Sequence, residues 1–169
     1  GKVMKPWEML LISEEQTLNI QSNSSSLPGI AYRTIDKNVQ EDAFQIQLDG
    51  STTAGIRFSA INAISADLSI VSKEMSALVL TVKRNSDVTA PVSISMACDG
   101  SELNSESCIA SVDVSQALAN LPNGEWAKLS IDVSCFANQG LKFDKLVKPF
   151  ELMSKSKLTL SMSDVYFEA

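Results

Sequence analysis

Apolar residues occupy every second position along most of this chain. Phe44, Ile46 and Leu48 alternate with polar residues, and the same period recurs in segments 56–60, 78–82, 92–96, 108–114, 129–135 and 158–162. Because successive side chains of a β-strand point to opposite faces, this period predicts strands with one apolar and one polar face. Turn-forming pairs such as Asp49-Gly50 and Asp99-Gly100 separate the segments. The pattern predicts an all-β fold, an antiparallel β-sandwich of the jelly-roll type.

The chain has 169 residues, the length of one domain. We expect residues 9–169 to form a single β-sandwich domain and residues 1–8 to be an interdomain linker or a cloning remnant. Two short connecting helices are expected, at 115–120 and 143–148, because Pro122 and Pro149 follow them closely.

Two positions break the alternation. Leu158, Leu160 and Met162 are even-numbered, whereas the apolar residues that follow, at 165 and 167, are odd. A β-bulge near Ser163 would direct both sets into the core. Trp126 is also out of phase with the apolar residues of its own segment, 129–135. A bulge at Ala127 would turn Trp126 inward to cap the core, which we favour; without a bulge, Trp126 would be an exposed platform for a sugar ring.

Composition excludes most catalytic machinery. The chain has no histidine, so it cannot hold a Ser-His-Asp or Cys-His arrangement, and three cysteines cannot form a four-thiolate zinc site. No Gly-rich phosphate-binding loop is present. A net charge of −6 without a long basic run argues against nucleic acid and anionic membranes as partners. We therefore expect a non-enzymatic domain without a catalytic cofactor.

Five segments in order resemble a known family. They are KPWEMLL, VQEDAFQIQLDG, SALVLTVKRNS, SVDVSQALANLPNGEWAKLSIDVSCFA and FDKLVKPFELMSKSKLTLSMSDVYFE. Together they are similar to the C-terminal galactose-binding-like domain of bacterial glycoside hydrolase family 3 exo-β-1,3/1,4-glucanases and β-glucosidases.

The resemblance implies a non-catalytic accessory domain of an exported enzyme, periplasmic or secreted, that degrades β-glucan. Its partners would be the catalytic domains of the same polypeptide, which carry the nucleophile and the acid/base, and a homodimer could form through the parent enzyme. The first role that we expect is docking on the catalytic domains and supporting them. The alternative is weak binding of β-glucan oligosaccharides.

Candidate residues exist for both roles. For docking we select Trp7, Met9 and Leu11, because an apolar run, 9–12, is typical of a strand covered on both faces or of a contact with a neighbouring domain. Plain core packing is the alternative.

For sugar contact we select Gln45, Gln47 and Arg57, expected on the polar face of two adjacent strands, with Trp126 or Tyr32 as the aromatic partner. Amide and guanidinium groups suit sugar hydroxyls. A solvated sheet face is the alternative.

Cys98 and Cys108 share the inward phase of consecutive strands, so they could form a disulfide or remain as two thiols. Cys135 is expected to be a buried free thiol.

A structural calcium ion is a further candidate feature, with Asp164 and Glu168 as ligands and Asp36 and Asp42 as additional candidate ligands, although no calcium-loop spacing is present.

Overall fold

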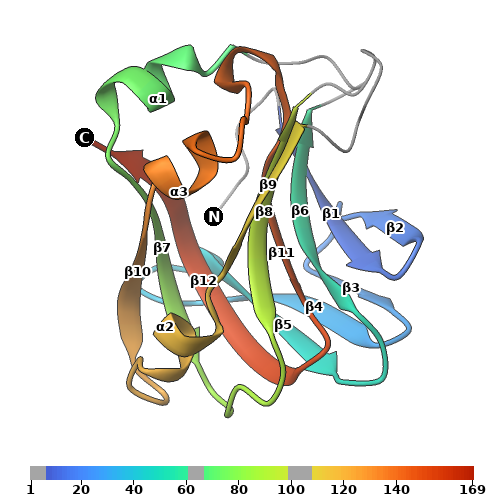
Figure 1. The fold of residues 1–169 in the computed structure, drawn as a ribbon. Helices are drawn as coiled ribbons and strands as arrows, with labels where there is room; N and C mark the ends of the chain where they lie inside the picture. Colours follow the sequence, from blue (N-terminus) through green and yellow to red (C-terminus); the bar gives the residue numbers. More distant parts are fainter. Residues whose placement is uncertain (1–6, 61–66, 99–107) are drawn as a thin grey trace.

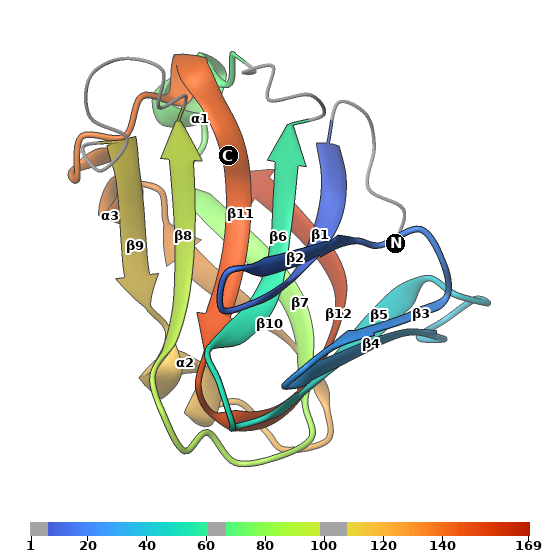
Figure 2. The same cartoon turned by 90° about the vertical axis from the view of Figure 1, so that its right-hand side faces the viewer.

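Two six-stranded antiparallel sheets face each other across one hydrophobic core (Figure 1). The structure, a computed structural model, describes residues 7–60, 67–98 and 108–169. Sheet A has the strand order β2-β1-β6-β11-β8-β9, and sheet B has the order β10-β7-β12-β5-β4-β3. Figure 2 shows sheet A from its outer side, with the strands of sheet B behind it. The predicted all-β sandwich is confirmed.

The strands of sheet A are β1 (Trp7–Ser13), β2 (Gln16–Asn19), β6 (Ala54–Ala60), β8 (Val92–Cys98), β9 (Ile109–Asp113) and β11 (Leu146–Ser154). The strands of sheet B are β3 (Ser24–Leu27), β4 (Ile30–Ile35), β5 (Ala43–Asp49), β7 (Ala77–Arg84), β10 (Trp126–Asp132) and β12 (Lys157–Glu168). Short helices α1 (Ser69–Glu74), α2 (Ser115–Ala119), α3 (Ser134–Ala137) and η3 (Phe143–Lys145) lie in the connections. None of the helices in the described residues is long and apolar enough to cross a membrane.

The turns follow the local sequence. Gly29 and Gly50 have positive φ angles of 91° and 81°, a conformation that glycine adopts without steric cost. Gly29 lies between β3 and β4, and Gly50 follows the end of β5. The Asp49 carboxylate accepts the backbone N–H of Ser51 at 2.8 Å, which closes the second turn. The predicted turn at Asp99-Gly100 lies outside the described residues.

The core is built from the inward phase of both sheets. Phe136, Phe150, Leu11 and Ile46 are among its largest fully buried side chains. Leu158, Leu160 and Met162 are buried as well. The register of β12 against β7 shifts between Met162 and Asp164, so the bulge predicted near Ser163 is confirmed, and Val165 and Phe167 pack against the core.

The bulge proposed at Ala127 is wrong. The register of β10 against β7 runs without a break from Trp126 opposite Lys83 through Ala127 opposite Val82. Trp126 therefore stays on the outer face of sheet B, half-buried. Because the pairing with β7 is continuous, Trp126 lies on the face opposite to the apolar residues of β10, as the alternation in the sequence indicates.

Two helix expectations differ in outcome. The first helix is present as α2. The second is a single 3-10 turn, Phe143–Lys145, after which the chain enters β11. Pro149 lies inside this strand, at the register shift against β8 between Lys148 and Glu151. A proline cannot donate to a sheet ladder, so an irregular position tolerates it.

Cys135 is exposed, so the expectation of a buried thiol is wrong. Strand β10 ends at Asp132, whose carboxylate accepts the backbone N–H of Ser134 at 2.9 Å, and α3 begins there. Strand parity therefore no longer applies at Cys135.

Strand β1 begins at Trp7, two residues before the expected start of the domain, and residues 1–6 lie outside the described part.

Candidate functional site

One row of side chains crosses the outer face of sheet B. Strand pairing sets each member directly opposite the next, and the members, in order from β10 to β3, are Trp126, Lys83, Ser161, Gln45, Arg33 and Ser24. We call this set the cross-sheet row. Its residues come from six strands, so only the folded sheet brings them together.

The centre of the cross-sheet row is a hydrogen-bonded chain. Arg33 donates from Nε and Nη2 to Gln45 Oε1 at 3.1 and 3.0 Å. Gln45 donates from Nε2 to Ser161 Oγ at 3.3 Å. Gln45 is 7% exposed and Ser161 is fully buried although both point away from the core. These bonds fix the orientation of the Gln45 amide.

A shallow groove lies over this part of the sheet. It consists of two adjoining hollows of about 360 and 710 Å³ that share Ser26, Ala31 and Gln47. The smaller hollow includes Arg33 and Gln45. The polar side chains of the larger hollow include Asp49, Ser86, Asp87, Lys157 and Thr159. We call the two hollows together the sheet B groove. It offers many hydrogen-bonding groups and no aromatic wall of its own beyond an edge of the otherwise buried Tyr32.

Trp126 lies at the far end of the cross-sheet row, between two cations. The ammonium of Lys83 is 5.3 Å from the centroid of the indole, and that of Lys37 is 5.4 Å away. Lys37 belongs to the connection between β4 and β5. In Figure 1 this connection (pale blue) extends beside β7 and β10.

Carboxylates hold this connection in place. Asp42 accepts the backbone N–H groups of Lys37, Asn38 and Val39 at 2.6, 2.9 and 3.2 Å. Asp36 accepts the backbone N–H of Glu41 at 2.6 Å. The hydrogen bonds from Lys37 and Asn38 lower the pKa of the Asp42 carboxyl. Both carboxylates thus have a structural role in this loop.

The structure brings Gln45 and Gln47 together in the sheet B groove but separates Arg57 from them. Arg57 lies on β6 in sheet A, on the other side of the sandwich, so the prediction of two adjacent strands is wrong. Consecutive strands of a sandwich often belong to different sheets, and periodicity does not report which sheet a strand joins. Arg33 on β4 occupies the place expected for Arg57.

Tyr32 is not an exposed platform. It is 5% exposed and packs in the core, with its ring centroid 5.5 Å from that of Phe44. Burial raises the pKa of the Tyr32 hydroxyl. The exposed tyrosine is Tyr166, on the outer face of sheet B.

Sequence reasoning missed Arg33, Lys37, Lys83 and Ser161. Period-two alternation in β4 could have placed Arg33 on the outer face, because Ile30 and Tyr32 take the inner phase. The contact of Lys37 with Trp126 depends on a loop that reaches across other strands, and no local pattern encodes it.

Two of the three docking candidates are core residues. Met9 is 9% exposed and Leu11 is fully buried. Their strand pairs on both sides, with β2 and β6, and its odd-numbered side chains point inward, so neither residue offers a docking surface. Trp7 is half-buried and lines a separate hollow of about 400 Å³ together with Glu8 and Glu41.

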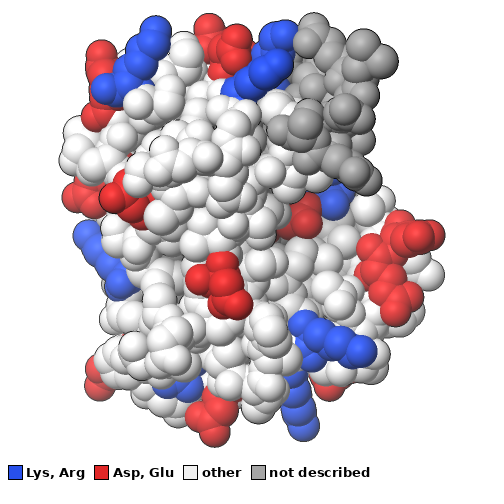
Figure 3. Space-filling view, viewed as in Figure 1, with Lys and Arg blue, Asp and Glu red and all other residues white. Residues whose placement is uncertain are grey.

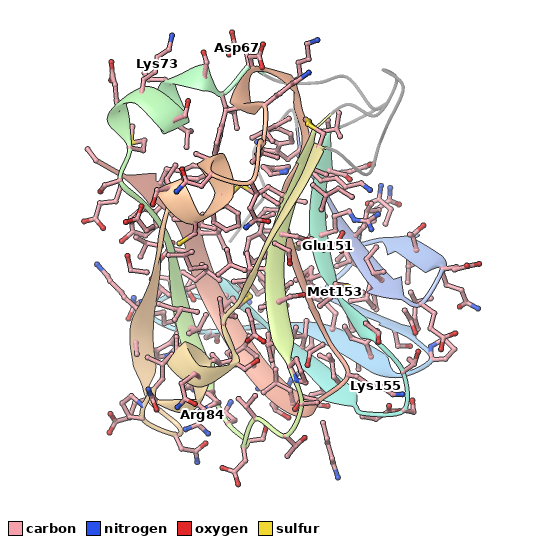
Figure 4. All side chains as sticks on the ribbon, viewed as in Figure 1. Asp67, Lys73, Arg84, Glu151, Met153 and Lys155 are labelled. Atoms are coloured by element: carbon pink, nitrogen blue, oxygen red, sulfur yellow. A yellow bond between two sulfur atoms is a disulfide. The ribbon has the colours of Figure 1, made fainter. Side chains whose placement is uncertain are left out.

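The outer face of sheet A carries paired charges. Arg57 donates from Nε to the Glu151 carboxylate, and both side chains are less than one-fifth exposed. Figure 4 shows Glu151 and Met153 on β11 in the middle of this sheet. Lys148 lies beside them. Burial, and secondly the Arg57 guanidinium, lower the pKa of the Lys148 ammonium, against the opposite effect of Glu151.

The structure pairs Cys98 with Cys108 in a disulfide, with a Cα–Cα distance of 5.3 Å, in agreement with their shared inward phase.

Asp164 and Glu168 both lie exposed on β12, four residues apart, which is about 13 Å along a strand. That separation is too long for one calcium ion to bridge. Across the described residues, no group of three or more Cys, Asp or Glu side chains could hold a metal ion.

Comparisons with known proteins agree with this architecture. The exo-1,3/1,4-β-glucanase ExoP from a Pseudoalteromonas species superposes with a TM-score of 0.72 at 15% identity, over 98% of this chain and 19% of that enzyme. Its extra C-terminal domain alone gives a TM-score of 0.71 at 16% identity, covering 98% of this chain and 87% of that domain. This chain thus spans about a fifth of the length of the full enzyme.

A further similar structure is a family 11 carbohydrate-binding module from Clostridium thermocellum in complex with a β-1,3-1,4-mixed-linked tetrasaccharide. Its TM-score is 0.58 at 10% identity, over 99% of this chain and 91% of that module. No curated protein matches at a significant level. The sequence model of the Exop_C family, described as galactose-binding domain-like, matches residues 5–167. The resemblance noted from the sequence is thus confirmed, and the chain belongs to this galactose-binding domain-like family.

Proposed function

We propose that this chain is a non-catalytic accessory domain of an exported β-glucan-degrading enzyme and that its sheet B groove binds a β-glucan oligosaccharide weakly. The observation that carries the proposal is the hydrogen-bonded row of Arg33, Gln45 and Ser161 on the floor of an open groove. Family membership and the fold shared with a module that holds a mixed-linked tetrasaccharide support it.

The chemistry of the groove suits a neutral sugar. Vicinal hydroxyls both donate and accept. The exposed amide of Gln47 offers both kinds of group, and Arg33, held by the buried Gln45 amide, offers its remaining N–H donors in a fixed plane. The groove is open rather than enclosed, so a bound sugar would keep much of its hydration. Weak affinity, in the millimolar to high micromolar range, follows from such partial burial.

Export and attachment to catalytic domains belong to the same proposal. A disulfide between Cys98 and Cys108 suits an oxidising compartment such as the periplasm or the exterior. Docking on the catalytic domains is proposed from family membership, and Met9 and Leu11, which lie inside the core, take no part in it.

Titration calorimetry with a mixed-linked β-glucan tetrasaccharide tests the binding role. Replacing Gln47 by alanine removes an exposed amide shared by both hollows, and we expect affinity to fall about five- to tenfold. The matched control is Gln116→Ala, which removes another exposed glutamine, on α2, and should leave affinity unchanged. Absence of binding at millimolar sugar, or equal loss in both variants, would refute the role.

A further inference from the structure

Positive charge collects at the Trp126 end of the cross-sheet row. Lys37 and Lys83 both lie against the indole, whereas Arg33 stands in the same row three pairings beyond Lys83. The chain as a whole has a net charge of −6. On the face shown in Figure 3, by contrast, acidic and basic side chains are interspersed. On the outer face of sheet B, two ammonium groups thus gather at one ring of an acidic protein.

Ion pairs on the described part of the chain do not reach these cations. Within the described ranges, the ion pairs found join Arg57 to Glu151 and Arg84 to Asp87, and none involves Arg33, Lys37 or Lys83. The nearest outward-facing carboxylate on β12 is Asp164, which lies opposite Thr81, two residues from Lys83 along β7. Its side chain bonds to the Ser163 hydroxyl at 3.2 Å.

A cation–π contact accounts for one lysine ammonium beside the indole of Trp126, but it does not account for the presence of a second. A single lysine gains from the negative face of the ring. Both ammonium groups lie within 5.4 Å of the same centroid, hence at most about 11 Å from each other, and their like charges repel. An anion placed between the two would remove this repulsion and accept hydrogen bonds from both.

The position of Lys37 is built rather than accidental. Its backbone N–H is held by the Asp42 carboxylate at 2.6 Å, so the loop that carries it has a defined path over the sheet. Lys83 is fixed within β7, directly opposite Trp126. The β4–β5 connection and strand β7 therefore each place one ammonium group beside the half-buried ring of Trp126.

We infer that the Trp126 end of the row is a subsite for an acidic sugar, one that carries a carboxylate or a sulfate ester. The anionic group would sit between Lys37 and Lys83 and draw both ammonium groups from the ring. The indole face that they leave would stack on the apolar face of the pyranose. This inference rests on the proposed function, because the neutral part of the same glycan would lie along the sheet B groove.

The test compares three oligosaccharides of equal length in calorimetric titration of the 169-residue chain at low salt: a neutral β-glucan, a polyuronate and a sulfated glucan. We expect at least one acidic oligosaccharide to bind about tenfold more tightly than the neutral one. This advantage should shrink as sodium chloride is raised, because salt screens the charges. The two acidic ligands distinguish carboxylate from sulfate ester.

Variants locate the effect. Lys37→Gln and Lys83→Gln should each abolish most of the acidic preference and leave neutral binding unchanged. The matched control is Lys73→Gln on α1, at the opposite end of the sandwich from Arg84 in Figure 4, and it should retain the preference. In a Trp7→Phe background, the fluorescence of Trp126 should change with the acidic ligand, because the ring exchanges lysine for sugar.

The outcomes separate the two proposals. Neutral binding that depends on Gln47, without an acidic preference, overturns the acidic subsite and leaves the proposed function standing. An acidic preference that survives both lysine variants also overturns the subsite. No binding of any of the three sugars overturns both proposals. Melting temperatures of the variants show whether a loss of binding comes from unfolding.

Discussion

On the outer face of sheet A, Arg57 is paired with Glu151, whereas on the outer face of sheet B Arg33 is bonded to the Gln45 amide and Lys37 and Lys83 lie against Trp126. Both faces are polar in the sequence. On sheet A the polar groups satisfy one another, so their role is structural. On sheet B, hydrogen-bonding capacity and positive charge are left for a ligand.

The difference indicates where substitutions should act. Changes on sheet A should alter stability and leave sugar binding intact, and changes on sheet B should do the reverse. Stability and binding can be measured on the same variants, so a single variant can test whether the two faces differ in this way.

The largest effect is expected at Gly55, in the middle of sheet A. A Cβ atom at this position would overlap the carbonyl oxygen of Leu152 and lie 2.8 Å from Met153 Sδ. Because β6 and β11 pair here, Gly55→Ala should force the strands apart. We expect a loss of at least about 3 kcal/mol in the free energy of unfolding, measured with urea, or failure to fold.

Gly140→Ala is the control for this prediction. Gly140 has a positive φ of 84°, but no atom would lie within 4 Å of the new Cβ. The cost should be only the strain of the backbone conformation, about 1 kcal/mol. Equal costs at the two glycines would show that β6 and β11 do not approach as closely as described.

The second effect concerns the ion pair. Glu151→Gln leaves the largely buried Arg57 guanidinium without its carboxylate, so stability should fall by about 1–2 kcal/mol in urea unfolding. Affinity for the tetrasaccharide should not change. Glu168→Gln, at an exposed position on β12, should alter stability by less than about 0.5 kcal/mol. Weakened sugar binding in Glu151→Gln would contradict the idea that the outer face of sheet A acts on stability alone.

The same two faces show what sequence reasoning can reach. The alternation in β5 and β12 and the parity shift near Ser163 are local, and each predicted the correct inner face. The parity of Trp126 was equally informative. The inward placement of Trp126 is wrong because it required a bulge at Ala127, and no feature of that strand's own sequence indicates a bulge there.

Long-range placement could not be predicted from the same signals. Gln45 and Ser161 are 116 residues apart in the chain and share a hydrogen bond, whereas Gln45 and Arg57 are close in the chain and lie in different sheets. The apolar run of β1 predicted a covered strand correctly, but Met9 and Leu11 are covered within this chain rather than by a neighbouring domain. Sheet membership is decided by the packing of the whole domain.

The third effect concerns the loop that carries Lys37. Asp42→Asn weakens the acceptor of three backbone N–H groups, so the loop should loosen and the preference for an acidic sugar should fall several-fold. The folded pKa of Asp42 is below its ordinary value of 3.8, so its stabilising effect is present above pH 3.8 and is lost as pH falls through the folded pKa. Titrations with Asp67→Asn, on the connection before α1, provide the control. An unchanged preference in Asp42→Asn would show that the loop does not position Lys37.

The smallest effect is a pH dependence on sheet A. The folded pKa of Lys148 is below its ordinary value of 10.5, mainly because of burial, so the unfolded chain binds the proton more tightly. Stability should therefore rise slightly as pH increases from the folded pKa toward 10.5. Titration of the Lys148 side-chain carbon resonances by NMR should give a midpoint below 10.5, and Glu151→Gln should lower it further by removing the one carboxylate that favours the charged form. A midpoint at 10.5 would mean that Lys148 is solvated and that sheet A, like sheet B, leaves a cation free, and a midpoint above 10.5 would mean that attraction to Glu151 outweighs burial.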